Sequence, residues 1–234
     1  MKLYSFGGDP DYHRLRPAHG RGWDWRGGAP ITFKWPTPEL ELADVDRDTG
    51  GFVPVDCLPM NSECDGPILS DFAREALGDL LQPAGEFWPV SVLGLQYWWF
   101  NCLAGVDALD RAATHADWDV VSGDWGEFRW ITLPRRLAFR PEAVAGAPAV
   151  FRVPEFPQGA LLAREAVNDA VTREGLTGFR LDPVWSAEEG GVRGPAGFGL
   201  DEVFEERGPG EIAPKRARAR AALDFRKAHA ASER

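Results

Sequence analysis

The residues that most often carry enzyme chemistry are few and scattered in this chain. Its four histidines are His13, His19, His115 and His229, and only His115 falls near the expected core. Cys64 and His115 would act as nucleophile and base only if the fold joined them. The sequence has no Gly-x-Ser-x-Gly elbow, no phosphate-binding or dinucleotide-binding glycine loop and no His-Glu-x-x-His pair. We therefore expect no catalytic residues and no cofactor.

One series of carboxylates has the spacing of a metal site. Asp44, Asp46 and Asp48 alternate as in an EF-hand calcium loop. The sixth and twelfth residues counted from Asp44 are Thr49 and Val55, whereas the calcium loop needs Gly and an acid there. We interpret the series as a solvated turn and expect no metal ion.

The element that must position any functional group is the tryptophan-rich run of residues 96–103. Its four consecutive aromatics, followed by Asn, Cys and Leu, predict the central strand of a sheet covered on both faces. A buried Asn101 needs hydrogen-bond partners, and we expect it to tie this strand to the next turn. We expect that turn to be helical, with Asp107 and Asp110 capping or orienting backbone amides rather than acting as paired carboxylates.

Residues 101–110 read Asn-Cys-Leu-x-x-Val-Asp-Ala-Leu-Asp. This run resembles the hallmark of a bacterial immunity-protein family encoded beside polymorphic toxins, immunity protein 11, formerly a domain of unknown function. Shorter runs look like the same family's pattern, in the same order, at residues 35–42, 68–71, 151–153 and 175–179. The resemblance covers residues 1–186. It implies a protein that binds and neutralises a cognate toxin without catalysis.

The periodicity of the chain predicts an α+β fold with a mixed or antiparallel sheet. Ser70 should cap a helix that ends before Pro83 and Gly85. Strands are predicted at residues 2–6, 31–35, 39–42, 87–90, 117–121, 127–133, 137–139 and 150–153.

A helical stripe followed by a strand occurs twice, 94 residues apart. The second copy has its stripe at residues 166–171 and its strand at residues 181–184. Two units related by duplication are one interpretation, and chance is the other. Each of these strands contains a proline, which predicts an edge position or a bulge.

The charge of the chain is unevenly distributed. The net charge is −10, but residues 211–234 carry seven Lys or Arg against three acids, which leaves −14 on residues 1–210. We expect a domain over residues 1–186, followed by a Gly/Pro-rich linker and a flexible, basic helical tail at 187–234. The tail is either solvated or docked on the acidic body.

The longest aperiodic segment, residues 9–30, predicts a surface loop. It contains Trp23, Trp25 and Arg26, residue types that dominate protein interfaces, although the tryptophans could instead fold back onto the core. Acidic residues follow it, at Glu39, Glu41, Asp44 and Asp46. We take these seven residues as the candidate toxin-binding surface.

Three functional classes remain open from the sequence. The first is an immunity protein that binds a cognate toxin, and its acidic body would complement a basic one. The second is a hydrolase-type enzyme with residues near Asn101, Asp107 and His115, and the third is a carbohydrate- or peptide-binding module that uses the loop tryptophans. An acidic body argues against nucleic acid, and no apolar run of membrane-spanning length occurs. We expect a cytoplasmic protein with three reduced cysteines, and the sequence leaves its oligomeric state open.

Overall fold

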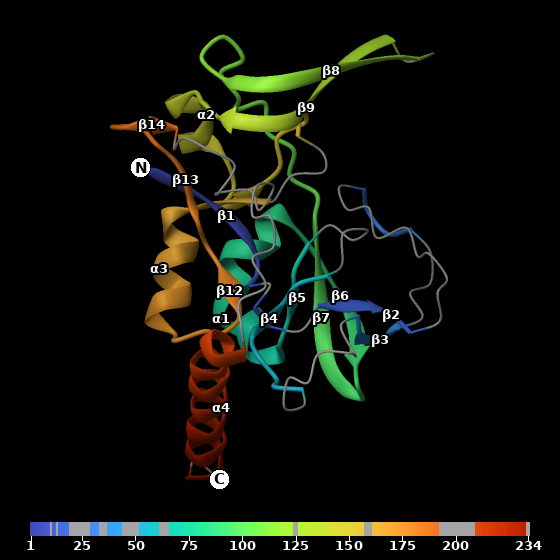
Figure 1. Cartoon of the computed structure of the whole chain (residues 1–234), viewed down its shortest axis with the longest axis vertical. Helices are drawn as coiled ribbons and strands as arrows, with labels where there is room; N and C mark the ends of the chain where they lie inside the picture. The colour runs from blue at the N-terminus through green and yellow to red at the C-terminus, as the bar shows by residue number, and fades with distance from the viewer. Residues whose placement is uncertain are drawn as a thin grey trace.

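The protein has an α+β fold, described here from a computed structural model (Figure 1). The structure describes residues 1–9, 11–12, 14–18, 29–32, 37–43, 52–60, 66–123, 126–156, 161–191 and 209–232. Within these residues there are four α-helices and three sheets. The predicted fold class is confirmed, and one of the sheets is mixed because it contains a parallel pair of strands.

The elements follow one another along the chain in an irregular order. The helices are α1 (Asp71–Leu81), α2 (Pro141–Gly146), α3 (Glu165–Arg173) and α4 (Pro209–Ser232), and a 3-10 turn, Gln82–Ala84, follows α1. The strands are β1 (Lys2–Gly8), β2 (Leu15–Pro17), β3 (Glu39–Leu42), β4 (Cys57–Leu58), β5 (Ile68–Leu69), β6 (Gly85–Val92), β7 (Leu95–Cys102), β8 (His115–Gly123), β9 (Gly126–Arg136), β10 (Val150–Phe151), β11 (Leu161–Arg164), β12 (Phe179–Arg180), β13 (Pro183–Ser186) and β14 (Gly190–Gly191).

The mixed sheet has the order β2-β3-β6-β7-β5-β4, so the tryptophan-rich strand β7 is internal, as predicted. Trp99 and Phe100 are fully buried on its opposite faces because apolar residues cover both sides. A bridge between Leu15 and Met60 brings β2 beside the residues that follow β4. The sheet is thereby nearly closed into a barrel.

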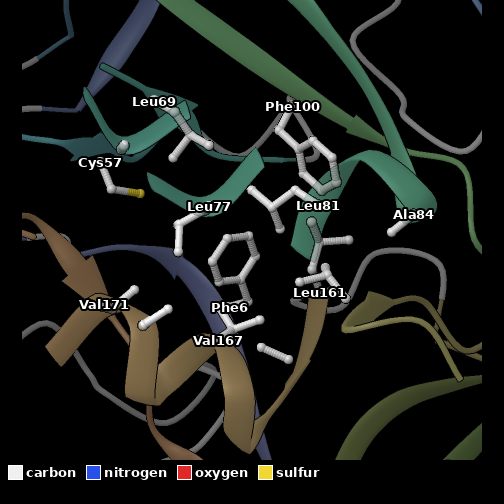
Figure 2. Packing of buried hydrophobic residues seen from close by; sticks show 14 of the residues in the cluster. Phe6, Cys57, Leu69, Leu77, Leu81, Ala84, Phe100, Leu161, Val167 and Val171 are labelled. Atoms are coloured by element: carbon white, nitrogen blue, oxygen red, sulfur yellow. The ribbon is translucent and has the colours of Figure 1, made fainter. Parts of the chain in front are cut away.

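The second sheet is antiparallel and is built around β1. It has the order β10-β11-β1-β13-β14, and β12 pairs with the end of β1. Helices α1 and α3 pack between the two sheets, with Phe6 of β1 between them (Figure 2). Leu77 and Leu81 of α1 face Val167 of α3 in this core, which explains why both helices carry an apolar stripe.

Strands β8 and β9 form a separate two-stranded sheet at one end of the molecule (Figure 1). Both strands were predicted from the alternation of apolar and polar residues. Ile131 of β9 is buried against the cluster that contains Leu137 and Phe139, so the base of the hairpin is attached to the core. Val120 of β8 is exposed.

Several predicted elements differ in the structure. The turn at 103–110 is not helical: Gly105 and Leu109 make isolated bridges with Arg152 and Phe139 instead. A strand was predicted at 137–139, but only Phe139 makes a bridge, and helix α2 forms in the connection after it because Pro141 favours the first turn of a helix. Of the predicted strand at 31–35, residues 31 and 32 are outside any strand and the rest lie outside the described residues.

A duplication of the two helix-then-strand units is not shown by the fold. The strand after α1 is β6, which lies in the mixed sheet, whereas the strands after α3 are β12 and β13, which pair with β1. Residues 181 and 182 of the predicted second strand separate β12 from β13. Pro183 fits its predicted setting, because it lies at a register shift of β1 and β13. Pro89 does not: β6 is internal in its sheet, and Pro89 is tolerated there because it lies outside the short stretch that pairs with β3.

The cap of α1 gives a direct test of how this core is held. The Ser70 hydroxyl accepts a hydrogen bond from the Ala73 amide and donates one to the buried carboxylate of Asp56, both about 3 Å long. We predict that Ser70→Ala lowers the free energy of unfolding by about 2 kcal/mol, since it removes a helix cap and one partner of a buried charge. Urea denaturation measures this loss. Ser122→Ala, on the exposed part of β8, is the control and should change it little, and an equal effect of both would contradict the prediction.

Candidate functional site

Two of the seven candidate toxin-binding residues lie on strand β3. Glu39 is exposed, and Glu41 forms an ion pair with Arg16 of β2 at 2.8 Å. Leu40 between them is fully buried, so the strand presents its acids outward as the alternation predicted. Trp23, Trp25, Arg26, Asp44 and Asp46 lie outside the described residues. Their place in the candidate surface therefore stays a prediction.

Asn101 is buried, as predicted, but its partners are not those expected from the sequence. Its side-chain amide donates to the Ala29 carbonyl at 2.8 Å and to the Glu86 carboxylate at 3.0 Å. The same Glu86 oxygen accepts the Ile31 amide at 2.9 Å. The expected link to the following turn is not among these bonds, which hold residues 29–31.

Asp107 and Asp110 have different roles, and neither is a paired catalytic carboxylate. The Asp110 carboxylate accepts the amides of Ala112 and Ala113, both at 3.1 Å, which confirms a capping role. Asp107 instead forms ion pairs with Arg111 and Arg140. Desolvation acts to raise the pKa of Asp107, but the hydrogen bond from Arg140 and the charge of Arg111 outweigh it, so the pKa is lowered. This carboxylate is therefore ionised and paired with two arginines.

The remaining groups suited to nucleophilic or metal chemistry are not assembled into a site. Burial raises the pKa of the Cys57 and Cys102 thiols, so both stay protonated in the core. Cys64 lies outside the described residues, and His115 is exposed on β8. Among the residues that the structure describes, no group of three or more His, Cys, Asp or Glu side chains is arranged to hold a metal ion.

Sequence reasoning missed Asp56, the most heavily bonded carboxylate of the described chain. Asp56 is 4% exposed, and its oxygens accept hydrogen bonds from Ser70 at 3.0 Å and from the amide and hydroxyl of Thr177, both at 2.8 Å. The guanidinium group of Arg226 in α4 donates a further hydrogen bond to the Asp56 carboxylate, at 2.6 Å. An acid inside the apolar run 53–58 is the one sequence signal that could have found it.

The glycine after Thr177 allows the segment with Thr177 to lie close to residues 56 and 57. Gly178 has φ +79°, and a Cβ built there would lie 2.2 Å from the Cys57 carbonyl oxygen. Any other residue would both strain the backbone and push the two segments apart. The run 175–179, which resembles the immunity family's pattern, is therefore explained by its close approach to residues 56 and 57.

Helix α4 docks on the acidic body, which is the second of the two alternatives for the tail. Lys215 forms ion pairs with Asp9, at 2.9 Å, and with Asp11, and Arg226 pairs with Asp56. These cations are eleven residues apart, just over three helical turns, so they lie on the same face. Ala219 on this face is 1% exposed, whereas Phe225 is 62% exposed.

The ion pair of Lys215 also has a defined pH range. Desolvation acts to lower the pKa of Lys215, but the hydrogen bonds to Asp11 and Asp9 outweigh it, so the pKa is raised above its ordinary value. A raised pKa means that the folded state binds this proton more tightly than the unfolded state. The contribution is therefore complete below the ordinary pKa of lysine and is lost as the pH rises through the raised value.

Comparison with known proteins identifies the middle of the chain. Residues 88–186 match the model of the immunity protein family Imm11. This stretch is similar to that family. The Imm11 region begins in β6 and ends with β13, so it includes β7, the β8–β9 hairpin and α3. The runs at 101–110, 151–153 and 175–179 lie within it, whereas those at 35–42 and 68–71 lie before it. No curated protein matches the chain.

The Imm11 match implies a toxin-neutralising immunity role. Proteins of such a family are typically non-catalytic inhibitors, which confirms the prediction that the chain is not an enzyme and removes the hydrolase alternative. The carbohydrate- or peptide-binding alternative depended on Trp23 and Trp25, which lie outside the described residues. Among the described residues, no helix combines the length and the apolar character that crossing a bilayer demands.

The role of Asn101 can be tested by removing its amide. We predict that Asn101→Ala lowers the free energy of unfolding by about 2–3 kcal/mol, because it removes the hydrogen bond to the Ala29 carbonyl and one of the two that the Glu86 carboxylate accepts. Thermal unfolding measures this loss. Asn168→Ala, which changes a partly exposed amide on α3, is the control and should have a small effect. Equal stability of Asn101→Ala and the native protein would contradict the assigned contacts.

The docking of α4 can be tested by reversing its two anchoring charges. In Lys215→Glu/Arg226→Glu, acids would face Asp9, Asp11 and Asp56, so we predict that α4 detaches and that trypsin cleaves it at least ~10-fold faster. Limited proteolysis followed by mass spectrometry measures the rate. Arg218→Glu/Arg220→Glu has the same change of net charge on the exposed face of α4 and is the control. Cleavage of both variants at one rate would contradict the docked helix.

Proposed function

We propose that this chain protects a cell by binding a cognate toxin in the cytoplasm and holding it inactive through protein–protein contact. The match of residues 88–186 to the Imm11 immunity family carries the proposal, because an immunity role implies a toxin as partner. The chemistry of the described residues is consistent with it. The buried polar side chains of Asp56 and Asn101 are engaged in structural contacts, and the thiols of Cys57 and Cys102 stay protonated.

The partner that fits this chain best is a basic toxin, for example a nuclease. Residues 1–210 carry a net charge of −14, and such a surface attracts basic partners and increases the rate of their association. The contacts of α4 support this preference. Its Lys215 and Arg226 are held by carboxylates of the body, which shows that the body accommodates cationic groups on a helix.

The proposed contact surface is the one expected from the sequence: Trp23, Trp25, Arg26, Glu39, Glu41, Asp44 and Asp46. Two observations on the described residues support it. Glu39 and Glu41 point outward from β3, and Glu39 is exposed. Asn101, within the Imm11 region, fixes residues 29–31, which follow Trp23 and Trp25 in the sequence. Tryptophan, tyrosine and arginine side chains supply most of the binding energy at protein interfaces.

The proposal predicts rescue of cells from the toxin encoded beside this gene. The toxin domain of the neighbouring open reading frame is expressed with and without the full chain, and survival and co-purification are measured. We expect survival only when the chain is present, together with a stable complex. Toxicity that is unchanged in cells making normal amounts of the folded chain would overturn the proposal.

The same assay separates the contact surface from the overall charge. Glu39→Lys/Glu41→Lys should weaken binding at least ~10-fold, because it reverses the charge inside the proposed surface. Glu75→Lys/Asp79→Lys changes the net charge equally on the exposed face of α1 and is the matched control. Equal affinities of the two variants would assign the effect to net charge alone and place the contact elsewhere.

A further inference from the structure

The turn between β6 and β7 exposes two large apolar side chains. Val92 pairs with Leu95, so the hairpin is closed by a two-residue turn of Leu93 and Gly94. Leu93 is 48% exposed and Leu95 is 44% exposed. Of the described residues, six large hydrophobic side chains are exposed, and these two lie within three residues of each other. Apolar groups gathered at a hairpin tip, instead of the usual polar turn residues, are typical of a contact surface.

The backbone of this turn makes leucine an unfavourable choice. Leu93 has φ +49° and Gly94 has φ +79°, the two positive angles of a type I′ turn. This turn strongly prefers Asn-Gly, because asparagine tolerates the left-handed region and a bulky side chain does not. Leucine at position 93 therefore destabilises the fold while it adds exposed apolar area. Strain that folding does not require points to a function for the side chain.

The neighbourhood of the tip is strained and acidic. Among the described residues, the only other non-glycine residue with positive φ is Thr37, at +52°, just before β3. Strand β3 pairs with the end of β6, and the Leu93 amide donates to the Leu40 carbonyl. The hairpin tip therefore lies directly beside the strand that presents Glu39 and Glu41 outward.

We infer that the β6–β7 tip, Leu93 and Leu95, is the apolar anchor of the toxin contact and that the acids of β3 form its rim. The occupant is a face of the cognate toxin that offers an apolar depression bordered by basic side chains. An apolar centre with a charged rim is the usual arrangement of a specific protein interface, in which the centre supplies most of the affinity. This inference rests on the proposed function and assigns the anchor of its binding surface.

The decisive variant is Leu93→Asn, which creates an Asn-Gly turn. The change relieves the strained leucine, so the melting temperature of the full chain should rise by about 2 °C. The same change removes an apolar anchor, so the affinity for the neighbouring toxin domain should fall at least ~10-fold. Greater stability with weaker binding is a combination that damage to the fold cannot produce. Leu95→Ser, which leaves the turn unchanged, should also weaken binding.

Calorimetry of the purified full-length proteins measures both quantities. Val120→Thr, which alters an exposed apolar residue of β8, is the control and should bind as the native chain does. If the native chain binds the toxin and Leu93→Asn and Leu95→Ser bind it within twofold, the anchor is overturned while the proposed function stands. If the native chain neither binds nor protects, both are overturned. A native dimer that Leu93→Asn converts to monomer, with unchanged toxin affinity, would assign the tip to a second copy and also overturn the inference.

Discussion

The carboxylate of Asp56 is the constraint on which much of this structure depends. A charge that is 4% exposed is tolerated only when its oxygens are fully hydrogen-bonded and a cation is close by. Ser70, Thr177 and Arg226 supply these partners from the start of α1, from the turn after α3 and from α4. Because the partners are up to 170 residues away in the chain, a single buried charge holds segments that the hydrophobic pattern alone would leave free to shift.

The Imm11 region serves as the rigid support of the molecule. Strand β7 is internal in the mixed sheet and fully buried at Trp99 and Phe100, so a polar group on it has a fixed position. Asn101 uses this position to hold Ala29, and Glu86 on the paired strand β6 holds Ile31. Asn101, which lies within the matched stretch, thus holds a segment that precedes the match.

The surface differs from this support because it is acidic and because one of its turns has a residue that is unfavourable there. Acids point outward along β3, a strained leucine closes the β6–β7 hairpin, and Lys215 of the basic helix α4 pairs with carboxylates of the body. A protein that acts by shape and charge needs its exposed side chains in fixed positions, which a dense aromatic core supplies.

The sequence by itself determined the local elements of this protein: strands β1, β3, β7, β8 and β9, helix α1 with its Ser70 cap, and the acidic charge of the body. These features depend on periodicity and capping within a few residues, so they can be recognised in one segment at a time. The short strands β4 and β5, the partners of Asn101 and Asp56, and the docking of α4 were decided by tertiary structure. Two-residue strands have no period, and the partner of a buried polar group is set by which distant segment the packing brings within 3 Å.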